Sequence, residues 1–164
     1  MRFHDLLLTS AASLTFFGCA STSRTAEADQ PVGPSWSGNL QPTQQRTGGL
    51  AVTGQTKAFG QVAISSAPGR LQRMHVKLTV SLPSQGAASY RWAVLPDRCG
   101  AGSLPLIGFD QFPLIEVSTN GRGEVNADLP LELTPNGTYH VNVYDGGQQL
   151  DNVVTCANLR FNGG

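Results

Sequence analysis

The stretch of sequence that decides the fold is SYRWAVLPDRCG, at residues 89–100, together with VVTCANL, at residues 153–159. In the first stretch, aromatic and aliphatic residues occupy alternate positions up to Pro96, and Cys99 follows in a short loop sequence. The second stretch is rich in β-favouring residues and contains Cys156. Together the two stretches predict strands of a β-sandwich that is closed by a disulfide.

Alternation of apolar and polar residues predicts further half-buried strands along the chain. The clearest alternation covers residues 74–82, and Asn120-Gly121 predicts a hairpin turn because both residues tolerate a positive φ angle. The other expected strands cover residues 36–40, 58–65, 114–119, 123–129, 139–143 and 152–161. No segment has a helical period. We therefore expect an all-β chain, with one Greek-key β-sandwich of about seven or eight strands at residues 35–164.

The composition agrees with one β-rich domain and excludes one class of partner. The chain has 164 residues, of which 40% are hydrophobic and 13% charged, with 19 Gly and 10 Pro. This length accommodates one domain of ordinary size plus a targeting segment, and the many turn-forming residues indicate short elements. The net charge is zero and there is no long run of Lys or Arg, so we expect no nucleic-acid partner.

The N-terminus has the pattern of an export signal. Residues 6–17 are mostly apolar but too few to span a bilayer as a helix, and Gly18-Cys19 follows them. A small residue before a cysteine at this place resembles the lipobox of bacterial lipoproteins. The resemblance implies that residues 1–18 are a signal peptide and that Cys19 is lipidated. Ordinary secretion with a chance cysteine is the alternative.

The segment after this cysteine predicts how the domain is held. Residues 19–34 are rich in Ser, Thr and Ala and have little to bury, so we expect a lipidated cysteine followed by a flexible tether. In the sorting pattern of such lipoproteins, Ala20 in place of Asp implies the outer membrane. The expected location is the cell envelope, at the periplasmic face of the outer membrane.

The cysteine count predicts one disulfide. Of the three cysteines, a lipidated Cys19 leaves Cys99 and Cys156, which lie in an oxidising compartment if the chain is exported. A bond between Cys99 and Cys156 would close a long loop of chain and stabilise the fold by about 4 kcal/mol in the chain-entropy model. Two buried free thiols are the alternative.

The order of these landmarks resembles the copper/zinc superoxide dismutase-like β-sandwich over residues 36–161. The shared features are an aromatic-rich strand ending in a loop cysteine, a turn hairpin, a Tyr-x-Val-x-Val strand and a second cysteine strand, at residues 90–99, 120–133, 139–143 and 153–159. In that family the two cysteines form an intrasubunit disulfide, which implies a bond between Cys99 and Cys156. An immunoglobulin-like or other Greek-key sandwich is the alternative.

The metal ligands of that family have no counterparts in this chain. The family has a His-x-His on the strand where this chain has residues 90–94, and further histidines in the loop where residues 100–113 have none. Tyr144 stands where another histidine would be expected, and Val153 replaces the arginine that precedes the second cysteine. We therefore expect no metal site, no cofactor and no catalytic residues.

The residues alone lead to the same expectation. Beyond the signal segment the chain has two histidines, His75 and His140, on separate predicted strands, and it has no Gly-x-Ser-x-Gly. We expect a non-catalytic, lipid-anchored binding or structural module that contacts the membrane through its lipid. An envelope protein is the expected partner, bound at a sheet edge or at the loop of residues 100–113. The alternative is a metal-binding oxidoreductase or metal-delivery protein that uses His75, Met74 and His140.

Overall fold

Strands make up most of the described chain. The computed structural model describes residues 33–43, 46–47, 50–51, 57–67, 69–70, 72–83, 88–145 and 152–163, all within the unit Pro31–Gly164. The expected signal peptide, the expected lipidation site Cys19 and nearly all of the expected tether lie outside these residues. The strands are β1 (Ser35–Pro42), β2 (Arg46–Thr47), β3 (Leu50–Ala51), β4 (Phe59–Ser66), β5 (Met74–Ser81), β6 (Ala88–Pro96), β7 (Ile115–Val117), β8 (Arg122–Leu129), β9 (Tyr139–Tyr144), β10 (Val153–Asn158) and β11 (Arg160–Asn162).

Helix is almost absent from the described residues, which confirms the all-β prediction. The helical element among them is one 3-10 turn, η1 (Phe109–Gln111). None of the described residues belongs to a helix of the length and apolarity that crossing a membrane requires.

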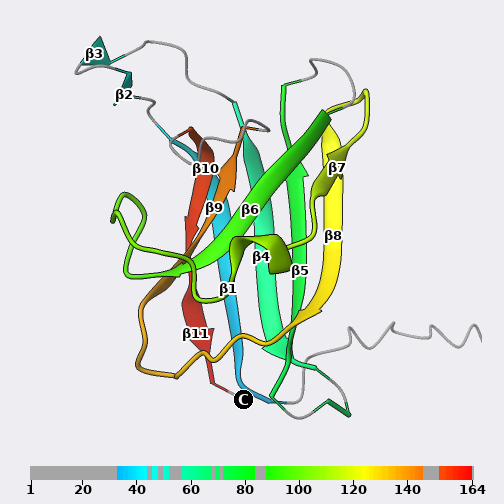
Figure 1. Cartoon of the computed structure of the whole chain (residues 1–164), viewed down its shortest axis with the longest axis vertical. Coiled ribbons are helices and arrows are strands. Elements are labelled where there is room, and N and C mark those ends of the chain that lie inside the picture. The colour runs from blue at the N-terminus through cyan, green and yellow to red at the C-terminus, as the bar shows by residue number, and fades with distance from the viewer. Residues whose placement is uncertain are drawn as a thin grey trace, which may run out of the picture. The chain divides into compact units, whose positions relative to one another are not determined.

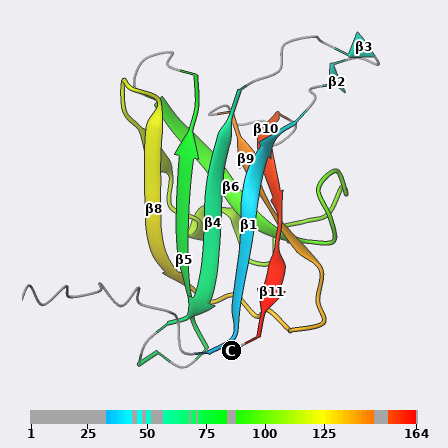
Figure 2. The same cartoon turned by 180° about the vertical axis from the view of Figure 1, so that it is seen from behind.

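The main sheet closes on itself through β1. Nine strands follow the order β10-β9-β6-β7-β8-β5-β4-β1-β11, and all their pairings are antiparallel. β1 pairs with β4 through residues 35–40 and with β10 at Gln41 and Pro42. Figure 2 shows β8, β5, β4 and β1 side by side, and Figure 1 shows β6 crossing the opposite wall.

This closure corrects the expected architecture. A sandwich has two sheets that face each other without pairing, whereas here hydrogen bonds run around a ring to form a β-barrel. The ring closes because β1 pairs with β4 along one edge and with β11 and then β10 along the other, and because the short β7 pairs with both β6 and β8.

The alternating sequence of β5 sets its two faces, as predicted. Val76, Leu78 and Val80 are buried in the core, whereas Lys77 between them is exposed. Trp36 from β1 and Trp92 from β6 are also buried in this core. One apolar cluster therefore fills the inside of the ring. The residues of β5 that face outward are polar.

The hairpin predicted at Asn120-Gly121 joins β7 to β8. Gly121 has a φ angle of 80°, and its N–H donates to the Ser118 carbonyl at 2.8 Å. The Asn120 side-chain oxygen accepts a hydrogen bond from the Arg122 N–H at 3.0 Å. β8 then pairs with β5 over its whole length, so this turn leads the chain from one wall of the barrel to the other.

Gly60 lies where β4 and β5 approach each other too closely for a side chain. A Cβ at this position would overlap the Thr79 carbonyl oxygen and lie 2.9 Å from Leu40 Cδ1. The first of these neighbours is backbone, so it cannot move without disturbing the pairing of the two strands.

We expect Gly60→Ala to lower the free energy of unfolding by about 1–3 kcal/mol, because the added methyl group forces β4 away from β5. The measurement is the urea unfolding midpoint of the purified protein. Gly102→Ala is the matched control, because a Cβ there has no heavy atom within 4 Å. Equal midpoints for the two variants would contradict the prediction.

Candidate functional site

A disulfide attaches the loop after β6 to β10. Cys99 and Cys156, the pair expected from the cysteine count, are bonded with a Cα–Cα distance of 6.0 Å. Beside the bond, the Cys99 N–H donates to the Asn158 side-chain oxygen at 2.9 Å. The loop is therefore held to the strand by one covalent bond and one hydrogen bond.

This loop covers the outer face of β6 and β9. The Leu106 N–H donates to the Val94 carbonyl at 2.9 Å. Phe109 packs edge-on against Tyr144, with 5.5 Å between ring centroids, and the Arg91 guanidinium lies 5.6 Å from the centre of the Phe109 ring. The apolar residues of this loop thus pack mostly onto the barrel, although Leu104 is 84% exposed.

The covered face is where the resemblance would place metal ligands, and its residues do not fit a metal. The register pairs Arg91 with Tyr144 and Ala93 with Asn142 on this face. Burial raises the pKa of Tyr144, which keeps its phenol protonated. Even with the single imidazole of His140 on the same face, an arginine, an alanine, an amide and a protonated phenol do not form a donor set for copper or zinc. Among the described residues, no three His, Cys, Asp or Glu side chains come together as a metal site would require.

His140 is fully buried beneath the loop. Its Nδ1 lies 3.1 Å from the Asp97 carbonyl oxygen and donates to it, so Nε2 carries the lone pair. Burial lowers the pKa of His140 and outweighs the opposite effect of hydrogen bonding to the backbone of Asp97 and Pro96. Within the described part of the chain, His140 Nε2 and Asn142 Oδ1 are buried without hydrogen-bond partners.

His75 lies elsewhere, on the outer face of β5. Its Nδ1 is 2.8 Å from Asp128 Oδ1, and Arg70 contacts the other carboxylate oxygen at 3.2 Å. The hydrogen bond from His75 is the main reason why the pKa of Asp128 is lowered. β5 and β9 are not neighbours in the barrel, so the structure does not bring His75 and His140 together. Met74 adjoins His75 in β5 and does not complete a metal site.

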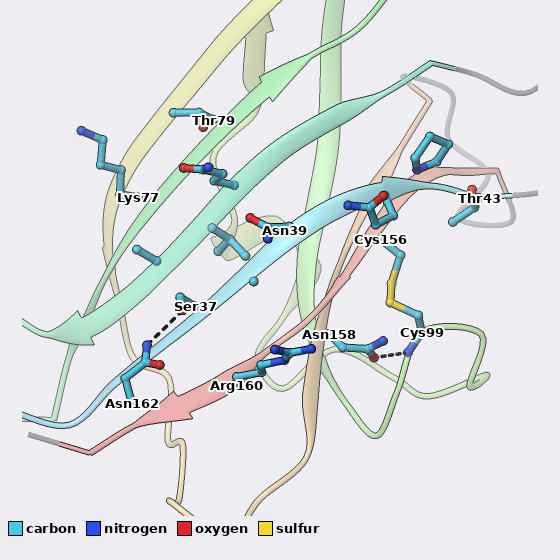
Figure 3. A pocket seen from close by; sticks show the side chains of 16 residues that line it. Ser37, Asn39, Thr43, Lys77, Thr79, Cys99, Cys156, Asn158, Arg160 and Asn162 are labelled. Atoms are coloured by element: carbon cyan, nitrogen blue, oxygen red, sulfur yellow. Dashed lines mark hydrogen bonds between the residues drawn. A yellow bond between two sulfur atoms is a disulfide. The ribbon is translucent and has the colours of Figure 1, made fainter.

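A groove lies on the outer face of β1, β4, β5 and β11. Its volume is about 840 Å³, and the disulfide forms part of one end (Figure 3). Its lining contains Lys77 and Arg160 but no carboxylate. The rest is mainly neutral and polar: Ser37, Asn39, Gln41, Thr43, Gln61, Thr79, Asn158 and Asn162.

Sequence reasoning missed this groove. The signal was present in β1, where Ser37, Asn39 and Gln41 alternate with the inward-facing Trp36 and Leu40. Such alternation predicts an outward polar face but does not say which other strands lie beside it. Only the pairing of β1 with β4 and β11, and of β4 with β5, shows that the lining residues lie side by side.

Comparison with protein-family models and with curated proteins finds no match for the chain.

Lowering the pH from about 7.5 to about 5.5 should reduce the free energy of unfolding, because of His140. The folded-state pKa of His140 is below its ordinary 6.5, so the unfolded chain binds more protons as the pH falls through that value. One proton corresponds to a slope of at most about 1.4 kcal/mol per pH unit. Urea midpoints at several pH values measure this slope.

His140→Gln should flatten the slope, whatever its effect on stability at neutral pH. His75→Gln is the control and should keep the decrease. The pKa of Asp128 is lowered from 3.8, so its loss of charge falls below this pH window. An unchanged slope in His140→Gln would show that another group causes the pH dependence.

Proposed function

We propose that the chain is a lipid-anchored cell-envelope protein whose domain, at residues 35–164, is a non-catalytic binding or structural module. Its fold is a Greek-key β-barrel, similar to that of superoxide dismutase but without the metal site. Residues 1–18 are the signal peptide, Cys19 carries the lipid and residues 19–34 form the tether. The lipid holds the domain at the periplasmic face of the outer membrane.

The strand order supports the Greek-key assignment. β6, β7 and β8 follow one another along the chain, and β9 returns to lie beside β6. The resulting spatial order, β9-β6-β7-β8, is that of a Greek key. The disulfide between the loop after β6 and the strand β10 is also at the place that the resemblance implies.

The observation that supports the non-catalytic assignment is the set of side chains on the outer face of β6 and β9, beneath the loop. Arg91, Ala93, Asn142 and Tyr144 occupy it with one imidazole, that of His140, and Phe109 packs against Tyr144 from the loop. This face therefore offers neither a set of metal ligands nor open access for a small substrate. The alternative metal-binding function would require His75 and His140 to converge, and their strands are not neighbours.

A partner protein in the envelope could contact the exposed part of the same loop. Leu104 projects from it, 84% exposed, while Phe112 is buried against the barrel. An exposed apolar side chain on a loop held by a disulfide gives a defined contact point without disturbing the core.

The lipid anchor can be tested by labelling producing cells with radioactive palmitate. We expect the full chain to carry label and to sediment with membranes, and Cys19→Ser to abolish both. The Cys99→Ser/Cys156→Ser double variant is the control and should keep the label, since a lipobox modifies only the cysteine that follows the signal peptide. Label retained in Cys19→Ser would refute the anchor.

The absence of a metal function can be tested by elemental analysis of the full chain, purified from an oxidising compartment and exposed to copper and zinc. We expect less than one metal ion per chain after dialysis, because the buried face lacks a donor set. One ion per chain that disappears in a folded His75→Ala/His140→Ala variant would favour the metal-binding alternative instead.

A further inference from the structure

Neutral hydrogen-bonding side chains and two cations line the groove in an ordered pattern. The register places Arg160, Ser37, Ala63 and Lys77 in one row across β11, β1, β4 and β5. The small residues Ser37 and Ala63 form the floor of the groove at this row. The long cationic side chains lie at the two ends of the row. With strands about 4.8 Å apart, the row spans roughly 14 Å between the outer Cα atoms.

A second row lies one step along the strands. It contains Asn39, Gln61 and Thr79, which the register places side by side on β1, β4 and β5. An Asn or Gln amide presents two donors and an acceptor, and a threonine hydroxyl is both donor and acceptor. The row therefore suits a ligand whose groups both donate and accept hydrogen bonds at regular intervals.

The positive charge of the groove is only partly neutralised. Lys77 contacts Glu124 at 3.7 Å, and both side chains are more than half exposed, so the pair is weak. Arg160 makes no ion pair within the described residues, and in Figure 3 it lies beside Asn158 at the opposite side of the groove from Lys77. A ligand with an anionic group could therefore pair with Arg160 without displacing a partner among these residues.

A second hollow continues the groove toward β8. Its volume is about 680 Å³, it shares Gln61 and Thr79 with the first, and its lining adds one cation and two carboxylates, those of Arg122, Glu116 and Glu124. Phe59 lines it and is 49% exposed, on the outward face of β4. An exposed aromatic ring beside hydrogen-bonding side chains provides a flat apolar surface for the C–H face of a ring-shaped ligand.

These features select among ligand classes. An extended peptide binds a sheet through free main-chain groups, but β1 and β4 are each paired on both sides here. A nucleic acid requires many more than two cations along the groove. A chain of sugar rings carries hydroxyl groups that both donate and accept, and its ring faces can pack on Phe59.

We infer that the groove binds an acidic oligosaccharide: hydroxyl groups of the sugars pair with Asn39, Gln61 and Thr79, and a carboxylate pairs with Arg160. The inference names a ligand for the binding module proposed above and rests on that proposal. The carboxylate could belong to a uronic acid or to the lactyl or peptide groups of peptidoglycan fragments. Both present the same chemistry to the groove.

The test is calorimetric titration of the purified full chain with a galacturonic-acid hexamer and with soluble peptidoglycan fragments, in about 0.15 M salt. We expect one of the two to bind, which identifies the source of the carboxylate. Maltohexaose, a neutral glycan of the same length, should bind at least tenfold more weakly. Polyglutamate should not bind measurably. No binding of either acidic glycan, or equal binding of maltohexaose or polyglutamate, would overturn the inference.

Variants locate the site. Asn39→Ala and Gln61→Ala should each weaken binding roughly two- to tenfold, because each removes hydrogen bonds to the ligand. Gln111→Ala removes an exposed amide from η1, outside the groove, and should have no effect. Unchanged affinity in the Asn39→Ala/Gln61→Ala double variant would overturn the assignment to this groove.

The charge is tested separately. Arg160→Gln should weaken binding of the acidic glycan roughly tenfold and leave the weak binding of maltohexaose unchanged. Lys57→Gln removes an exposed cation that does not line the groove and serves as the control. An equal loss in the two variants would show that general charge, not Arg160, attracts the ligand.

Failure of this inference is distinguishable from failure of the proposed function. The palmitate label and the metal content report on the anchor and on catalysis, and neither depends on the groove. A labelled, metal-free chain that binds no acidic glycan would refute the ligand alone.

Discussion

The double pairing of β1 is the constraint on which the barrel depends. Its first part pairs with β4 and β11, and its last two residues pair with β10. Between the residues of β1 that pair with β11 and those that pair with β10 lies Gly38, where a Cβ would be 2.7 Å from the Asn158 carbonyl oxygen. A side chain at this point would push the end of β10 away from β1 and weaken the closure of the ring. β1 therefore closes the barrel by pairing on both edges, and through Ser37 it also forms part of the floor of the groove.

Two outer faces of the same barrel have opposite access to solvent. Over β6 and β9, a loop held by the disulfide covers polar side chains and leaves His140 buried and neutral. Over β1, β4 and β5, no such cover is present among the described residues, and the polar side chains line an open groove. The disulfide separates the two, since Cys99 begins the cover and also lines the end of the groove. A buried polar face contributes to the shape of the fold, whereas an open one is available to a ligand.

Local sequence patterns predicted the strands well and their assembly less well. The alternation at residues 74–82 and the Asn120-Gly121 turn depend on neighbouring residues, and both lie where expected. Ring closure depends on which residues of β1 meet β10 across more than a hundred positions, and no local pattern carries that information. In β9, His140 alternates with the core residues Tyr139 and Val141, so its burial comes from the loop that packs over it and not from the pattern of β9 itself. The short pair β2–β3 lies in a stretch rich in Gln, Thr and Gly, where no alternating pattern predicts a strand.

The pairing of β1 with β10 and β11 also dictates when folding can finish. The first strand of the domain finds two of its partners only after the last strands have been synthesised, so the chain has to close its longest loop to complete the ring. Proteins dominated by such distant contacts fold slowly. Under the proposed export route, this delay would keep the polypeptide unfolded while it is translocated, and the native state would form only after the C-terminus has crossed the membrane.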